Sequence, residues 1–127
     1  MSSYVSAWFV AFAFTQVVEA PIYQRLLGCS FGSALVPSAL THPVLWFVIF
    51  PYLPLSYVQK AVIGETFVVL VETLCALLWL ALRGSHGPHT RLPTARRRAF
   101  WAFAVAFIAN AASMGLGLLS RHFFCVP

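Results

Sequence analysis

Long apolar stretches, separated by short polar or proline-rich breaks, divide the 127-residue chain into four predicted helices. The stretches cover residues 4–23, 33–53, 61–82 and 100–119. Each is close to the roughly 20 residues that an α-helix needs to cross a bilayer. Together they leave no room for a soluble domain. The pattern therefore predicts an all-α fold, in which residues 1–127 form a single domain: a polytopic integral membrane protein built as a bundle of four transmembrane helices.

The second predicted span contains prolines at positions 37 and 43. A proline inside a helix lacks an N–H donor and frees the carbonyl four residues earlier, which bends the helix. Within a membrane the freed carbonyl must be satisfied by protein, water or ligand. Because Thr41 and His42 directly precede Pro43, we expect a polar, proline-kinked break near mid-membrane. A neighbouring Ser or Thr that satisfies the carbonyl is the alternative interpretation.

Composition excludes a soluble protein. The chain is 61% hydrophobic and only 9% charged, with a mean hydropathy of +0.85. A soluble domain of this length would need far more charge to cover its surface.

The basic residues indicate how the bundle is oriented. Eight Lys and Arg against three acidic residues give a net charge of +5. Arg25 and the five arginines of residues 83–98 fall on one side of the predicted bundle, whereas Lys60 and Arg121 fall on the other. Because cytoplasmic loops carry the excess of Lys and Arg, we expect a basic cytoplasmic loop over residues 83–98. Both termini would then lie outside the cytoplasm, in a bacterial inner membrane.

Arg96, Arg97 and Arg98 come directly before the fourth predicted span. Such a cluster is typical of an anchor to lipid headgroups, so we predict that role for these three residues. Membrane lipids account for the basic balance, and no nucleic-acid partner is predicted.

The three acidic residues, Glu19, Glu65 and Glu72, all lie inside predicted spans. A carboxyl group at membrane depth is costly, so it usually faces a partner, a cavity or an ion path. Gln16 and Glu19 share a helix face. Glu65 and Glu72 are seven residues apart, which places them on one face about 10 Å from each other.

Depth in the membrane groups these residues into one candidate site. His42, Glu72 and Asn110 are predicted near mid-membrane, with Glu19 and Gln16 toward the cytoplasm and Glu65 toward the outside. No Lys or Arg lies within the central spans to neutralise the acids. Each carboxyl must therefore be protonated, hydrogen bonded to a neutral group, or bound to a cation.

Three kinds of site chemistry fit these residues. Burial favours a neutral carboxyl, so Glu72 could carry a proton. A divalent cation could take His42 and Glu72 as ligands. A pocket could bind a polar or cationic substrate headgroup. The structural alternative is a neutral hydrogen-bond network that holds four small helices together.

Enzyme signatures are missing from the chain. It has no H-E-x-x-H, G-x-S-x-G, P-loop or dinucleotide glycine pattern, and it has no Asp. No catalytic residue is therefore predicted. A membrane enzyme acting on a lipid, with His42 and a glutamate as acid and base, stays open as an alternative.

The fourth predicted span carries a stripe of small and polar residues: Ala106, Asn110, Ser113 and Gly117. Such stripes let membrane helices approach closely and hydrogen bond across the contact. In addition, each predicted helix pair has a glutamate in its first helix (Glu19, Glu72) and an imidazole or amide in its second (His42, Asn110). This order suggests a parallel internal repeat, as found in many transporters.

Several short motifs follow one another along the chain: Glu19-x-Pro, Thr41-His-Pro, Glu65-x-x-Val-Val-x-x-Glu and Asn110-x-x-Ser. This succession resembles a group of small uncharacterised bacterial four-helix membrane proteins. The resemblance covers most of the chain and implies a shared core of Glu19, His42, Pro43, Glu65, Glu72, Asn110 and Ser113. It implies no activity.

We expect a small transport or ion-handling protein with a buried Glu/His/Asn site. Glu72 would carry the proton or cation, His42 would be its partner, and Asn110 would orient the site. Because four helices are few for a solute pathway, we expect a homo-oligomer or association with other membrane subunits. The main alternative is a structural or accessory subunit of a larger membrane complex.

Overall fold

The computed structural model describes residues 2–82 and 94–124, and it is helical almost throughout. The elements are α1 (Ser2–Leu27), α2 (Phe31–Val44), the π-helical η1 (Leu45–Ile49), α3 (Phe50–Tyr52), α4 (Tyr57–Leu82) and α5 (Ala95–Phe124). Four stretches are long and apolar enough to cross a membrane: Ser3–Leu27, Phe31–Tyr52, Tyr57–Leu82 and Ala95–Leu119. The predicted all-α bundle of four helices is confirmed.

Most helix ends lie outside the predicted apolar spans, at residues whose local hydrogen bonds or backbone conformation start or stop a helix. α1 ends at Leu27, where Gly28 takes a φ of 65°, the left-handed conformation that glycine adopts readily after a helix. The Ser30 hydroxyl accepts the Ser33 N–H at the start of α2. Ser56 and Gln59 form a reciprocal capping box before α4, each side chain accepting the other residue's N–H.

The N-terminal end of α5 also begins earlier than predicted. The Thr94 hydroxyl accepts the Arg97 N–H at 3.3 Å and caps the helix. Arg96, Arg97 and Arg98 therefore lie in the first turn of α5, where all three are exposed, and not in a loop that lasts to residue 98. Residues 83–93 of that predicted loop lie outside the described part of the chain.

The second span changes from α-helix to π-helix shortly after Pro43. α2 continues through Pro37 and Pro43 to Val44, and the π-helical segment η1 begins at Leu45. Such π-helical turns are rare and frequently accompany functional sites. The bend predicted at Pro43 stays a prediction: residues 41–43 remain α-helical, and the π-helical segment begins two residues after Pro43.

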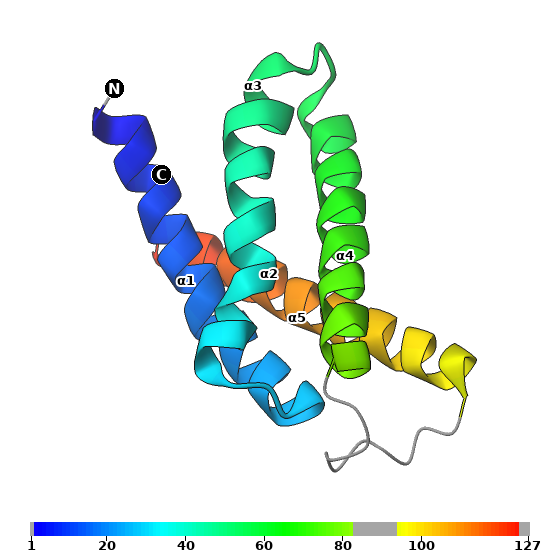
Figure 1. Cartoon of the computed structure of the whole chain (residues 1–127). Helices are drawn as coiled ribbons and strands as arrows, with labels where there is room; N and C mark the ends of the chain where they lie inside the picture. Colours follow the sequence, from blue (N-terminus) through cyan, green and yellow to red (C-terminus); the bar gives the residue numbers. More distant parts are fainter. Residues whose placement is uncertain (1, 83–93, 125–127) are drawn as a thin grey trace.

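The four long helices form a closed ring. α1 packs on α2, α2 on α4, α4 on α5, and α5 on α1. The C-terminal ends of α1 and α4 lie at the same end of the bundle, and α5 runs obliquely behind the other helices in this view (Figure 1). α1 and α4 therefore run in one direction and occupy one diagonal of the ring, while α2 and α5 occupy the other.

The interior of the bundle is small and polar, whereas its exterior is large and apolar. Side chains such as Phe9, Val17, Leu78 and Leu118 are more than half exposed. The core contains the alanines Ala20, Ala34, Ala76, Ala102, Ala106 and Ala109. The largest fully buried side chains are Tyr23, Glu19, Glu72, Val105, Thr41 and Ser38. This distribution is expected where the surroundings are lipid and helices pack through small residues and hydrogen bonds.

Candidate functional site

Glu72 is hydrogen bonded to a side chain from each of the other three helices. The Tyr23 hydroxyl of α1 donates to Oε2 at 2.7 Å. The Asn110 amide of α5 donates to the same oxygen. The Thr41 hydroxyl of α2 donates to Oε1 at 3.2 Å. The Glu72 side chain is 0% exposed, so one carboxyl group joins the whole ring of helices at its centre.

Glu19, on α1, has a similar but smaller set of partners. The Ser38 hydroxyl of α2 donates to Oε2, and the Ser113 hydroxyl of α5 donates to Oε1 at 2.6 Å. Glu19 is 1% exposed. The two glutamates occupy one diagonal of the ring, and the α2 and α5 groups that bind them occupy the other.

The two carboxyl groups share one further detail: at Oε1, each meets a hydroxyl that has a second acceptor. The Thr41 hydroxyl lies 3.2 Å from Glu72 Oε1 and also 3.2 Å from the Pro37 carbonyl oxygen. The Ser113 hydroxyl lies near Glu19 Oε1 and 3.1 Å from the Asn110 carbonyl oxygen. A hydroxyl has a single hydrogen, so each can donate to the carboxyl or to the backbone.

Both α2 and α5 supply their partner groups at a spacing of three residues. The pairs are Ser38 with Thr41 and Asn110 with Ser113, and in each pair one residue binds Glu19 and the other Glu72. Residues three apart lie on the same helix face. The predicted internal repeat matched His42 with Asn110, whereas the α2 groups that bind the glutamates are the hydroxyls of Ser38 and Thr41, so the repeat stays a prediction.

His42 is not hydrogen bonded to any glutamate in the described part of the chain. Its Nε2 is 3.4 Å from the Thr15 hydroxyl, and its ring packs near Phe12 and against Trp46, with centroids 5.4 and 6.1 Å away. The residue is 8% exposed, and its Nδ1 has no partner among the described residues. The predicted His42–Glu72 pair is thus not joined by a hydrogen bond in the described part of the chain.

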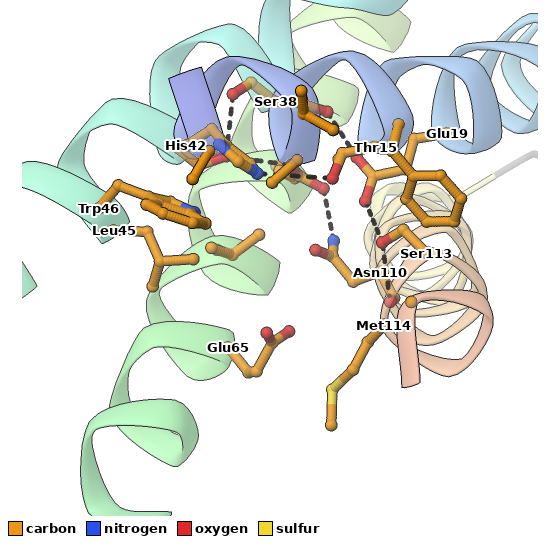
Figure 2. A pocket seen from close by; sticks show the side chains of 18 of the residues that line it. Thr15, Glu19, Ser38, His42, Leu45, Trp46, Glu65, Asn110, Ser113 and Met114 are labelled. Atoms are coloured by element: carbon orange, nitrogen blue, oxygen red, sulfur yellow. Dashed lines mark hydrogen bonds between the residues drawn. The ribbon is translucent and has the colours of Figure 1, made fainter. Parts of the chain in front are cut away.

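A cavity of about 840 Å³ brings most of the predicted site residues together. Its lining includes Glu19, Glu65, Glu72, His42, Asn110 and Ser113. In Figure 2, the labelled members of this set, Glu19, His42, Glu65, Asn110 and Ser113, approach one space from all four helices. The cavity extends along α1 to Ser6 and Ala7, which are exposed, so it opens toward the N-terminal end of α1.

Glu65 lines one wall of this cavity and has no hydrogen-bond partner among the described residues. It is half-buried on α4 and makes no hydrogen bond or ion pair with any side chain that the structure describes. Its carboxyl group points into the open space that Leu45 and Met114 also border (Figure 2). Glu65 therefore differs from Glu19 and Glu72, whose oxygens are occupied by protein donors.

Two other predicted features lie outside this arrangement. Gln16 is not part of the cavity lining, and its Nε2 donates to the Leu35 carbonyl at 3.1 Å. No group of three or more His, Cys, Asp or Glu side chains that could hold a metal ion is found within residues 2–82 and 94–124. The predicted metal ligands His42 and Glu72 line the same cavity, but Glu72 is already bonded to three side chains.

The sequence-based prediction missed three members of the network: Tyr23, Ser38 and Thr41 as ligands of the glutamates. The signal for Tyr23 was present, since it follows Glu19 by four residues on the same helix face. Ser38 lies one turn before His42 on α2, and Thr41 directly precedes it. The prediction assigned the imidazole, and not these hydroxyls, as the partner of Glu72. Comparison with protein families, with curated proteins and with solved structures finds no match.

Proposed function

We propose that this protein is a small transport or ion-handling protein of the bacterial inner membrane, in which Glu72 binds and releases a proton at the floor of the cavity. The main support is the arrangement around Glu72. Tyr23 and Asn110 both donate to Oε2. The Thr41 hydroxyl lies 3.2 Å from Oε1 and 3.2 Å from the Pro37 carbonyl oxygen, so it can donate to either. Asn110 and Tyr23 orient the carboxyl group. Both termini lie outside the cytoplasm in this proposal.

The proton has one favourable position on Glu72. An amide N–H and a phenol O–H both point at Oε2, and an amide N–H can only donate. A proton therefore fits at Oε1, where the protonated carboxyl donates to the Thr41 hydroxyl and Thr41 donates to the Pro37 carbonyl. When the proton leaves, Thr41 turns back and donates to Oε1. No helix has to move in this exchange.

Glu72→Gln tests the proposal because it reproduces the protonated state. Its amide oxygen accepts from Tyr23 and Asn110, and its NH₂ donates to Thr41 as the protonated carboxyl would. The variant should therefore fold while its side chain exchanges no proton. A carboxylic C=O band in pH-difference infrared spectra should appear in wild type and in the control Glu65→Gln, and be lost in Glu72→Gln. An unchanged band in Glu72→Gln contradicts the proposal.

Transport itself is measured in vesicles that contain a pH-sensitive dye, with the membrane voltage clamped. Protein-dependent proton flux should be present in wild type and fall to the level of empty vesicles in Glu72→Gln. Equal flux in both proteins would contradict transport through Glu72.

The second candidate is a structural or accessory subunit, alone or in a homo-oligomer. The observation in its favour is the complete hydrogen bonding of Glu72 to the three other helices. In that case Glu72→Gln leaves no functional defect, and only variants that remove the polar group affect assembly.

A further inference from the structure

We propose that the cavity binds a monovalent organic cation. Its ammonium group would pair with Glu65, and its apolar or aromatic body would pack against Trp46, Phe14 and Met114. This inference rests on the proposed function in treating the cavity as a solute site, and it adds the chemical class of the solute.

Charge is the first support. Three glutamates line the cavity, and no Lys or Arg is found among the lining residues that the structure describes. Glu19 and Glu72 are each hydrogen bonded to protein donors on both oxygens. Glu65 has no such donor among the described residues, so it is the carboxyl group left to pair with a bound cation. An unpaired charge at this depth is costly, and a cationic ligand removes that cost.

Size and lining are the second support. A volume of about 840 Å³ is within the range typical of pockets for small organic ligands. Phe14, Trp46 and Met114 supply apolar surface from three different helices or segments, and the Trp46 ring stacks with His42 and lies near Tyr4. Aromatic faces attract cations, and Trp does so most strongly. A proton or a bare inorganic ion would make no use of this surface.

The available ligand atoms also favour an organic cation over a divalent metal. Mg²⁺ and Ca²⁺ need about six or more oxygen ligands, and structural Zn²⁺ needs four protein ligands. Among the described lining residues, the uncommitted groups are the Glu65 carboxyl, the Asn110 side-chain oxygen and the buried His42 Nδ1, which are fewer than these metals need. A single ammonium group needs only one countercharge, so one carboxyl is enough.

His42 lines the cavity, but its unpartnered Nδ1 atom is buried and does not face the open space. Of the described buried side-chain atoms without a hydrogen-bond partner, His42 Nδ1 is the one whose residue lines the cavity. Buried polar groups are normally satisfied. Because Nδ1 has almost no accessible surface, a ligand in the cavity would reach it only if the imidazole turned, so the proposal rests on Glu65 and the apolar lining.

The test uses three probes with the same indole body and different charge: tryptamine (cationic), tryptophol (neutral) and indole-3-acetate (anionic). Binding is measured by isothermal titration calorimetry on the full-length protein in nanodiscs of zwitterionic lipid, which removes attraction to anionic headgroups. We expect tryptamine to bind about tenfold or more tightly than tryptophol, and indole-3-acetate not to bind. Equal binding of tryptamine and tryptophol to wild type overturns the proposal without any variant.

Glu65→Gln should reduce tryptamine affinity about tenfold or more and leave tryptophol affinity unchanged. The matched control is Thr66→Val, because Thr66 is the next residue on α4, is exposed and does not line the cavity. Unchanged tryptamine affinity in Glu65→Gln overturns the assignment.

The two proposals fail separately. Proton exchange by Glu72 without tryptamine binding removes only the ligand class. Tryptamine binding that depends on Glu65, together with an infrared band that Glu72→Gln does not change, removes the proton carrier and leaves a cation-binding protein.

Discussion

The carboxyl groups at the floor of the cavity (Glu19 and Glu72) and on its wall (Glu65) differ in burial and in hydrogen bonding. At the floor, Glu19 and Glu72 are fully buried and every oxygen accepts a hydrogen bond from another helix. On the wall, Glu65 is half-buried and has no partner among the described residues. A satisfied polar group supports the fold, whereas an unsatisfied one costs stability and is available to a ligand. Glutamate side chains in one cavity are therefore either bonded to the protein, as Glu19 and Glu72 are, or left without a described partner, as Glu65 is.

The largest predicted effect is on stability and separates the two regions directly. Glu72→Leu leaves the Tyr23 hydroxyl and one Asn110 N–H buried without an acceptor, whereas Thr41 can still donate to the Pro37 carbonyl. We expect it to lower the free energy of unfolding by about 2–4 kcal/mol. Glu65→Leu removes a carboxyl group that has no protein partner, so we expect no loss or a gain of up to about 1 kcal/mol. Unfolding in detergent, followed by circular dichroism, measures both. Equal losses would contradict the distinction between floor and wall.

A smaller effect is predicted at Thr41, within the floor. Thr41→Val keeps the shape of the side chain but removes the hydroxyl that moves between Glu72 Oε1 and the Pro37 carbonyl. We expect a loss of about 1 kcal/mol in stability and a several-fold slower proton flux in the vesicle assay, which Thr41→Ser should restore. If Thr41→Val carries protons at the wild-type rate, the hydroxyl does not take part in the exchange.

Helix number and depth could be predicted from the sequence, because both follow from the length and position of apolar stretches. The pairing of Glu72 with Asn110 at similar depth is an example: the two residues are predicted near mid-membrane, and the Asn110 amide donates to the Glu72 carboxyl. Glu65 and Glu72 also face one cavity, as their spacing of seven residues indicated.

Direction around the helix axis was harder to predict than depth. His42 and Thr41 are adjacent in sequence and lie at almost the same depth, but they point about 100° apart on an α-helix. Thr41 faces Glu72, and His42 faces Thr15 and the aromatic side chains of α1 and η1. Which of the two reaches the glutamate depends on how α2 is rotated against α4. The sequence contains no local signal for that rotation.

The smallest predicted effect concerns how the wall is positioned, and Gly64 is its test. Gly64 is buried beside Glu65, and a Cβ atom added there would overlap the end of the Leu45 side chain. Because that end is flexible and Leu45 lines the cavity, Gly64→Ala should displace Leu45. The helix gains about 1 kcal/mol from alanine, and the displaced packing offsets that gain, so stability should change by less than about 1 kcal/mol.

Tryptamine affinity should nevertheless fall several-fold in Gly64→Ala, because the displaced Leu45 borders the space in front of Glu65. Gly32→Ala is the matched control, since a Cβ there meets nothing within 4 Å and the residue is remote from the cavity lining. A Gly64→Ala protein that binds tryptamine as wild type does would show that Leu45 does not shape the ligand's position. The wall would then depend on Glu65 and Trp46 alone, and the close approach of α4 to η1 at Gly64 would serve packing only.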